Sequence, residues 1–225
     1  MVHASASITR LVDRWLARSA RPDAGALAVV AGFAPATVIT GASRGIGLAL
    51  AEQFSDAGQA VLLIARSAGN LEVAAEALRN RTPGATILTL ALDVTEADAG
   101  DAMDRFLAGH DCYLDVLVNN AAIGLGGPFA DGAAVDVDAL VALNVGAVTR
   151  LMRHALPAMT ARGRGGILNV SSLGGALPGP YQAAYYASKA YVQSLTEAVA
   201  AECAGNGVRI AVVAPGPVET GFHAS

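Results

Sequence analysis

The sequence predicts one α/β domain in which a doubly wound parallel β-sheet is covered by helices on both faces, giving a three-layer α/β/α fold. From residue 35 onward, short apolar runs alternate regularly with longer segments of helical periodicity. Each run is four to eight residues long and mostly apolar rather than alternating, as in strands buried on both faces. Apolar residues make up 53% of the 225 residues and charged residues 15%, which provides for a large buried core.

The predicted elements follow one another in a single repeating order. The expected strands are Thr37–Thr40, Ala60–Ala65, Ala85–Leu92, Leu114–Asn119, Gly166–Val170 and Val208–Val213. The expected helices are Ile46–Ala57, Asn70–Arg79, Glu96–Leu107, Val135–Arg162 and Ala184–Gly205. Right-handed crossovers would make the strands parallel, and ligands bind such a sheet outside the carboxyl ends of its strands.

Residues 1–34 are expected to form an extension in front of the domain, which would comprise residues 35–225. A short amphipathic helix is predicted around Ile8–Arg18, with Leu11, Trp15 and Leu16 on one side. Four arginines followed by the apolar stretch Ala24–Pro35 superficially resemble a secretory signal. That stretch is too short to span a membrane and continues directly into the first strand. We therefore expect a cytoplasmic protein whose extension packs against the domain or a partner subunit.

Charge and cysteine content exclude several classes of function. The chain has 15 basic and 19 acidic residues, a net charge of −4, and no cluster of lysine or arginine, so a nucleic-acid partner is not expected. Cys112 and Cys203 are far apart in the sequence and match no metal-binding or redox spacing. The sequence therefore predicts two reduced thiols, no metal site and no membrane association.

A glycine-rich turn follows the first predicted strand. It runs Thr-Gly-Ala-Ser-Arg-Gly-Ile-Gly from Thr40 to Gly47, and the next helix begins within it. Glycines let the backbone turn sharply and approach a pyrophosphate, and the start of a helix offers unpaired N–H groups to the phosphates. The spacing differs from the general Gly-x-Gly-x-x-Gly pattern, and a tight strand-to-helix connection is the structural alternative. Its position between strand and helix favours a dinucleotide site.

The end of the second predicted strand indicates which dinucleotide would bind. Sites for NAD usually have an acidic residue there, which bonds the ribose 2′-hydroxyl. This chain has Arg66 instead, and Arg44 lies in the glycine turn. Two guanidinium groups suit a 2′-phosphate, so NADP(H) is favoured over NAD(H). The alternative is a pair of solvated surface arginines.

Tyr185 and Lys189 are four residues apart at the start of the last long predicted helix, so they project from one helical face. A nearby ammonium group favours the phenolate form and would lower the pKa of the tyrosine. By itself the pair could be two ordinary helix residues. Further polar residues occur at the ends of the fourth and fifth strands and within a helix: Asn119, Asn120, Ser171, Ser172 and Asn144.

Taken together, these motifs resemble the short-chain dehydrogenase/reductase family over residue 35 to the chain end, which implies a Rossmann-type, NAD(P)-binding domain. The resemblance implies that Tyr185 donates a proton, that Lys189 binds the nicotinamide ribose and lowers the pKa of Tyr185, and that Ser172 rather than Ser171 orients the substrate carbonyl. Asn144 would support a water-linked proton relay to the lysine. The implied cofactor contacts are Gly41, Ser43, Arg44, Gly45, Ile46, Gly47, Arg66, Asp93, Val94, Asn120, Tyr185, Lys189, Pro215, Gly216, Val218 and Thr220.

The chain departs from the family pattern in two places. Ala122 replaces the glycine of the family's Asn-Asn-Ala-Gly motif, a change that we expect to be tolerated. The sequence also ends at Ser225, soon after the nicotinamide-side turn, so the family's substrate-covering segment, last helix and seventh strand are expected to be missing. Family members are commonly homodimers or homotetramers, and the same is expected here if that segment exists.

Three functions are consistent with the sequence. The first is an NADP-preferring oxidoreductase acting on CH–OH groups, with a ketone or 3-oxoacyl compound as the small-molecule carbonyl substrate. The second is a non-catalytic dinucleotide-binding module, because the substrate-covering segment is absent. The third is a structural remnant that binds nothing. Substrate selectivity would depend on the apolar loops Ile123–Asp131 and Leu173–Gln182.

Overall fold

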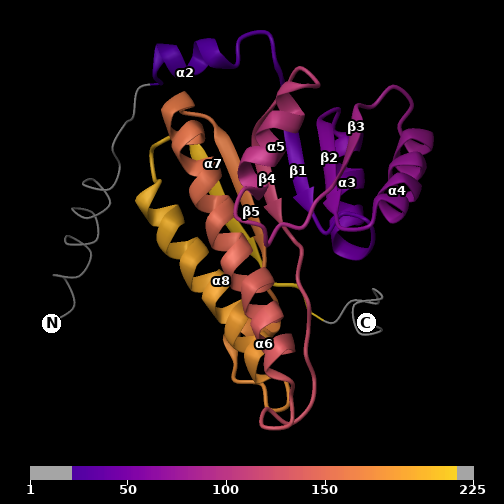
Figure 1. Cartoon of the computed structure of the whole chain (residues 1–225). Helices are drawn as coiled ribbons and strands as arrows, with labels where there is room; N and C mark the ends of the chain where they lie inside the picture. Colours follow the sequence, from indigo (N-terminus) through magenta and orange to yellow (C-terminus); the bar gives the residue numbers. More distant parts are fainter. Residues whose placement is uncertain (1–21, 217–225) are drawn as a thin grey trace, which may run out of the picture.

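The computed structural model describes residues 22–216, which form a six-stranded parallel sheet with helices on both faces (Figure 1). The strand order is β3-β2-β1-β4-β5-β6, the doubly wound arrangement that the alternating sequence pattern predicts. The strands are β1 Ala34–Thr40, β2 Ala60–Ala65, β3 Ile87–Ala91, β4 Cys112–Asn119, β5 Gly165–Val170 and β6 Val208–Val213.

The helices divide between the two faces of the sheet. They are α2 Ala24–Val29, α3 Gly45–Asp56, α4 Ala68–Arg81, α5 Ala99–Ala108, α6 Ala134–Val141, α7 Val148–Arg162 and α8 Ala183–Glu202. Helices α3 and α4 bury one apolar layer against the strands, around Leu63 and Leu71. Helices α5, α7 and α8 bury the other, around Met103, Met152 and Val192. The three-layer α/β/α prediction is therefore confirmed.

The predicted strands and helices from residue 35 onward are present, with differences at particular boundaries. Strand β3 begins at Ile87 rather than at Ala85, because Gly84 has a φ of +85° and the Ala85 N–H closes a turn onto the Thr82 carbonyl oxygen. Helix α2 lies where only an apolar stretch was expected; its N-cap Asp23 accepts a hydrogen bond from the Gly25 N–H. The predicted helix around Ile8–Arg18 lies outside the described residues.

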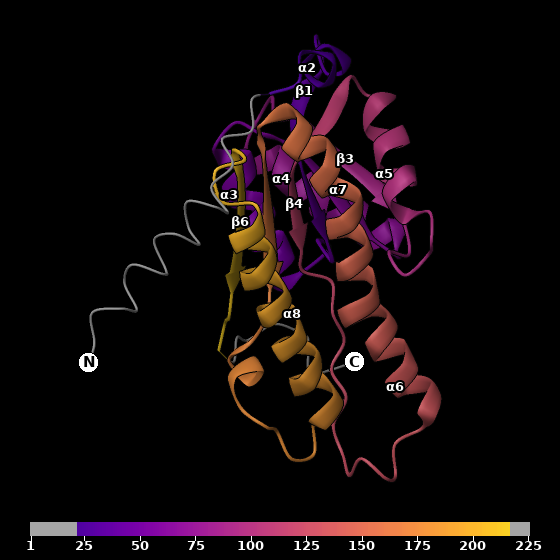
Figure 2. The ribbon, with the colours of Figure 1, turned by 90° about the vertical axis from the view of Figure 1, so that its left-hand side faces the viewer.

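The long helix expected over Val135–Arg162 is interrupted. Residues Ala142–Ala147 form a π-helical segment, η1, between α6 and α7. A π-helical turn accommodates one more residue than an α-helical turn, and such turns are frequent at functional sites. Figures 1 and 2 show that α6 and the first half of α8 project past the strands together, so η1 lies where the helical layer leaves the sheet.

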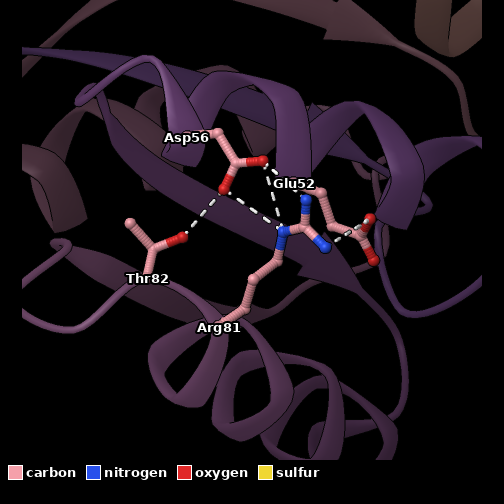
Figure 3. Close-up of polar contacts among 4 residues, drawn as sticks. All are labelled: Glu52, Asp56, Arg81 and Thr82. Carbon is pink, nitrogen blue, oxygen red and sulfur yellow. Dashed lines mark hydrogen bonds and ion pairs between the residues drawn. The ribbon is translucent and has the colours of Figure 1, made fainter.

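An exposed ionic cluster joins the end of α3 to the end of α4 (Figure 3). Arg81 is 2.8 Å from Asp56 and 4.0 Å from Glu52, and Thr82 donates a hydrogen bond to the same Asp56 carboxylate. The hydrogen bond from Arg81, with a second from Thr82, holds the pKa of Asp56 below its ordinary value. These charges lie on the outer surface, where ion pairs contribute little to stability.

Candidate active site

The glycine turn after β1 is built by close packing of backbone on backbone. Gly41 and Gly45 have φ values of +67° and +59°, a conformation that L side chains rarely adopt. At Gly47 a Cβ would overlap the Gly41 carbonyl oxygen and the side-chain amide of Asn120. No side chain caps the first turn of α3, so its N–H groups and the positive end of its dipole are open to an anion. The turn therefore fits a phosphate group.

Asn120, at the end of β4, holds this turn in place. Its amide Nδ2 donates to the carbonyl oxygens of Thr40, at 3.0 Å, and Gly41, at 3.1 Å. The hydroxyl of Thr40 accepts the backbone N–H groups of Asn120 and Ala121. The amide NH₂ group is thus committed to the protein backbone, and the expected adenosine contact would have to use another atom of Asn120.

Of the expected 2′-phosphate and adenine contacts, Arg66 and Asp93 follow the carboxyl ends of β2 and β3, whereas Arg44 follows β1 at the start of α3. Arg44 and Arg66 are both exposed, and Arg66 is close enough to Asp93 to favour its charged form. The main causes of the lowered pKa of Asp93 are hydrogen bonds from the Thr95 backbone N–H, at 2.9 Å, and the Thr95 hydroxyl, at 2.7 Å. Val94 is buried and belongs to the core under α5 and α7. Ser43 and Ile46 are half-buried in the glycine turn.

Tyr185 and Lys189 lie side by side on α8, with the Lys189 Nζ atom 5.7 Å from the centroid of the tyrosine ring. The lysine ammonium donates a hydrogen bond of 2.9 Å to the Val170 carbonyl oxygen at the end of β5. Burial lowers the pKa of Lys189 to about 8. Burial also raises the pKa of Tyr185, while a hydrogen bond with the Ser172 hydroxyl acts in the opposite direction.

The sequence-based expectation that Lys189 lowers the pKa of Tyr185 is therefore wrong for this structure. The phenolate is disfavoured by burial, and the net shift of the Tyr185 pKa is upward. Lys189 directs its ammonium at the Val170 carbonyl rather than at the phenol, and its own charge is disfavoured by burial.

The two serines at the end of β5 have different surroundings. The Ser171 hydroxyl is buried and donates to the Lys189 carbonyl oxygen at 2.9 Å, so it fastens α8 to the sheet. Ser172 begins the short 3₁₀ helix η2, Leu173–Ala176, where its hydroxyl accepts the Gly174 N–H at 3.1 Å and also bonds Tyr185. The geometry therefore pairs Ser172, and not Ser171, with the tyrosine.

Asn144 lies within η1 and is almost fully buried, with 1% exposure. Its amide forms a reciprocal pair with the backbone of Ile123, accepting the N–H and donating to the carbonyl, both at 2.9 Å. It also donates to the Ser188 hydroxyl at 3.1 Å, and Ser188 donates in turn to the Tyr185 carbonyl oxygen. Both protons of the Asn144 amide are used in joining the loop after β4 to α8, the helix that carries Tyr185.

The turn after β6 is described only in part. The Pro215 carbonyl oxygen accepts the Leu173 N–H at 3.1 Å, and Gly216 lies against the Leu173 side chain. The expected contacts Val218 and Thr220 lie outside the described residues. The turn is thus fixed to the segment that follows Ser172.

An apolar pocket of about 440 Å³ opens between α6, η1 and the start of α8. Its lining residues are Phe129, Val137, Val141, Val145, Ala183, Ala184, Ala187 and Ser188. Across residues 22–216, no group of histidine, cysteine, aspartate and glutamate side chains is placed to hold a metal ion. Within the same range, no helix has both the length and the apolar character that a membrane span requires.

The family model for short chain dehydrogenases matches residues 35–225, which is most of the chain. The chain belongs to the short-chain dehydrogenase family. Galactitol 2-dehydrogenase of Rhizobium johnstonii is 40% identical over 187 residues, covering 81% of this chain and 71% of the relative. A short chain dehydrogenase of Pseudocercospora fijiensis is 35% identical over 186 residues, covering 81% of this chain but 59% of the relative.

Solved structures of short-chain dehydrogenases superpose closely on this chain. A short-chain dehydrogenase from Sphingobium yanoikuyae in complex with NADPH has a TM-score of 0.77 at 32% identity and covers 84% of this chain and 73% of its own. A metagenomic short-chain oxidoreductase in complex with NADP has a TM-score of 0.75 at 38% identity, with 82% and 83% covered. The Rossmann-type fold expected from the sequence is therefore confirmed.

Several residues that support this short-chain dehydrogenase site were not singled out in the sequence. Ser188 connects Asn144 to the helix that carries Tyr185. Asn169 pairs with Asn119 across β4 and β5 at 2.8 Å and donates to Thr196 of α8 at 2.7 Å. Asn169 could have been suspected because it is a polar residue in an otherwise apolar strand, and a buried amide must find partners.

Proposed function

We propose that this short-chain dehydrogenase is an NADP(H)-preferring oxidoreductase that interconverts a carbonyl group and a secondary alcohol, with a ketone or 3-oxoacyl compound as substrate. The observation that carries the proposal is the convergence of Ser172, Tyr185 and Lys189. Ser172 follows the carboxyl end of β5, and the other two residues lie in the first turns of α8. A carbonyl oxygen placed between the Ser172 and Tyr185 hydroxyls would accept hydrogen bonds from both. Such bonds stabilise the negative charge that develops on that oxygen.

The dinucleotide would be held by the glycine turn of Gly41, Gly45 and Gly47, with its phosphates at the start of α3. When bound, it supplies the hydride to the carbonyl carbon. Tyr185 supplies the proton to the carbonyl oxygen as a general acid, and the Ser172 hydroxyl, which bonds the phenol, acts to lower the pKa of Tyr185 against the upward effect of burial. Lys189 lies beside the phenol and can replace the proton, since its own pKa near 8 allows it to exchange protons close to neutrality.

The preference for NADP(H) is supported by two exposed arginines and by a missing acid. Strand β2 ends at Ala65 and is followed by Arg66 and Ser67, so no carboxylate is present where a ribose 2′-hydroxyl would be bound. Arg44, at the start of α3, makes no hydrogen bond or ion pair through its side chain within residues 22–216, and its charge is available to a phosphate. The NADPH and NADP complexes of the Sphingobium and metagenomic proteins are consistent with this preference.

The first experiment compares the wild-type chain with Tyr185→Phe in two assays, fluorescence titration with NADPH and reduction of a panel of ketones and 3-oxoacyl thioesters. We expect NADPH to bind both proteins equally and turnover to fall by about 10²–10⁴-fold in the variant, because the proton donor is lost. Tyr191→Phe is the matched control, since it removes a phenol of the same helix that bonds only Thr149.

Each outcome separates the competing functions. Full turnover by Tyr185→Phe would overturn the catalytic assignment. Tight NADPH binding by the wild-type chain, without reduction of any member of the panel, would instead support a non-catalytic dinucleotide-binding module. Absence of binding would exclude both functions for this chain.

A further inference from the structure

An arginine outside the expected site is bonded to the loop that carries the adenine-side residues. Arg150 is in the first turn of α7, and its Nη2 atom donates a hydrogen bond of 2.7 Å to the Thr95 carbonyl oxygen. Thr95 lies in the connection between β3 and α5, two residues after Asp93. The two residues are 55 positions apart in the sequence, so this bond is a tertiary contact between α7 and the loop.

Thr95 is in turn hydrogen bonded to Asp93. Its backbone N–H and its hydroxyl both donate to one carboxylate oxygen of Asp93, at 2.9 and 2.7 Å, and the Glu96 N–H donates to the Asp93 carbonyl oxygen at 3.2 Å. The loop is therefore closed on itself around Asp93. Arg150 connects it to α7 by a hydrogen bond, in addition to the apolar packing of Val94 in the core. If Arg150 were removed, the loop would keep its internal bonds but lose this anchor.

The π-helical segment η1 determines where the arginine lies. A Cβ at Gly146 would be 3.1 Å from the Arg150 Nη1 atom, so the guanidinium packs closely over this glycine. Two residues earlier, Asn144 is bonded to Ile123 of the β4 loop and to Ser188 of the catalytic helix. One continuous stretch of chain, residues 144–150, is thus bonded to the catalytic helix at one end and to the adenine-side loop at the other.

We propose that Arg150 is a positioning residue for the adenine end of the dinucleotide site. It sets the distance between the loop containing Asp93 and Val94 and the helix that carries Tyr185. The proposal rests on the proposed function, because the adenine contact of that loop is part of it. Arg150 itself contacts neither the reacting atoms nor the glycine turn in this structure, and it acts through Thr95.

The test compares Arg150→Gln and Arg150→Lys with Arg153→Gln. Arg153 is exposed on the same helix and makes no side-chain hydrogen bond or ion pair with residues 22–216, so its substitution controls for the lost charge. The probes are adenosine 2′,5′-bisphosphate, which represents the adenine end alone, and reduced nicotinamide mononucleotide, which represents the other end alone. Binding is measured by calorimetry and turnover with a substrate from the active panel.

For Arg150→Gln we expect the Kd of adenosine 2′,5′-bisphosphate and the KM for NADPH to rise by about 2–10-fold, the range for the net contribution of one ordinary hydrogen bond. The kcat, and turnover with reduced nicotinamide mononucleotide, should stay within about twofold of wild type, since the catalytic end is untouched. Arg150→Lys keeps a donor and should recover part of the affinity. Amide hydrogen exchange of residues 95–98 in the free protein should accelerate in Arg150→Gln and not in Arg153→Gln.

Three results would overturn the inference. The first is wild-type affinity for the bisphosphate in Arg150→Gln. The second is an equal loss with both probes together with a lower Tm, which would indicate a general structural role. The third is failure of the wild-type chain to bind the bisphosphate although it binds NADPH. Failure to bind NADPH itself would also overturn the proposed function.

Discussion

The two ends of the proposed dinucleotide site are constructed in different ways. At the adenine end, the charged residues Arg44 and Arg66 are exposed and hold no other element in place. At the catalytic end, Lys189 and Asn144 are 4% and 1% exposed, and each is hydrogen bonded to a neighbouring strand or loop. The same chain thus presents free surface charges at one end and buried, internally bonded polar groups at the other.

Because of this difference, the residues expected to select the cofactor are not the residues that hold the fold together. An exposed arginine can be exchanged with little effect on folding, because its removal leaves no buried group unpaired. A buried polar group is part of the core, and removing it leaves partners without a hydrogen bond or changes the cost of burying a charge. We therefore expect substitutions of the exposed arginines at the adenine end to change affinity alone, and substitutions of the buried polar groups at the catalytic end to change stability.

The largest effect is expected at Lys189. Lys189→Met retains most of the side-chain length but removes the ammonium, and kcat should fall by about 10²–10⁴-fold at neutral pH in steady-state assays. Burial lowers the pKa of the lysine from 10.5 to about 8, so the folded protein binds this proton less tightly than the unfolded chain. That difference corresponds to a destabilisation of about 3 kcal/mol at pH 7, and the hydrogen bond lost to Val170 offsets about 1 kcal/mol of it. The inactive variant should therefore be the more stable protein.

Urea denaturation across pH checks this expectation for Lys189. Between about pH 8 and 10.5 the folded wild type has lost the lysine proton while the unfolded chain retains it, so wild-type stability rises relative to the variant. The stability advantage of Lys189→Met over wild type should be full below pH 8 and should be lost, and reversed by about 1 kcal/mol, above pH 10.5. A gap that does not change with pH would contradict the assigned cause.

The next largest effect distinguishes the two serines. Ser172→Ala should lower kcat/KM by about 10²–10³-fold with little change in Tm, because a hydroxyl that would bond the developing oxyanion is lost. Ser171→Ala should lower the free energy of unfolding by about 1–3 kcal/mol, because the buried bond to the Lys189 carbonyl is lost. Steady-state kinetics and thermal denaturation of both variants give the comparison. Similar kinetic losses in the two variants would disprove the separation of roles.

A smaller effect, confined to affinity, is expected at the adenine end. Arg66→Asp replaces a cation with an acid at the end of β2, and NADPH affinity should fall by about 10–100-fold while NADH affinity rises. Arg153→Asp makes the same charge change on α7 and should alter neither affinity. Fluorescence titration with each nucleotide measures the ratio. A Tm that falls in parallel with affinity would show that this end, too, supports the fold.

The smallest effect is expected in the exposed ionic cluster between α3 and α4 (Figure 3). Asp56→Asn removes the carboxylate that Arg81 and Thr82 bond, and because the cluster is solvated the Tm should change by no more than about 3 °C. Cofactor affinity should be unchanged. A larger change in differential scanning calorimetry would show that surface charge contributes more to this protein than its exposure suggests.

Much of the fold could be predicted because apolar periodicity and glycine placement are properties of short segments. The strand positions followed from the apolar spacing, whereas the preference for Ser172 over Ser171 came from the resemblance to the short-chain dehydrogenase family. Properties that depend on tertiary neighbours could not be predicted. The upward shift of the Tyr185 pKa results from burial, and the commitment of the Asn120 amide to the glycine turn results from β1 and β4 being adjacent in the sheet.

Other features had no local sequence signal. The bond from Arg150 to Thr95 joins residues 55 positions apart, and an exposed arginine on a helix usually faces solvent. The π-helical segment η1 could not be predicted, because the apolar residues of Val135–Arg162 are spaced as expected for one continuous α-helix. The assignments of Val218 and Thr220 stay predictions.

The π-helical segment also fixes the rotational phase between α6 and α7. One residue corresponds to about 100° of rotation about a helix axis. If Ala142–Ala147 adopted α-helical pairing without losing a residue, the extra residue would therefore turn α6 by that angle relative to α7. Leu140, which is fully buried, would be carried out of the core, and Val137 would leave the apolar pocket. The π-helical pairing of this segment is consequently required for the packing of α6.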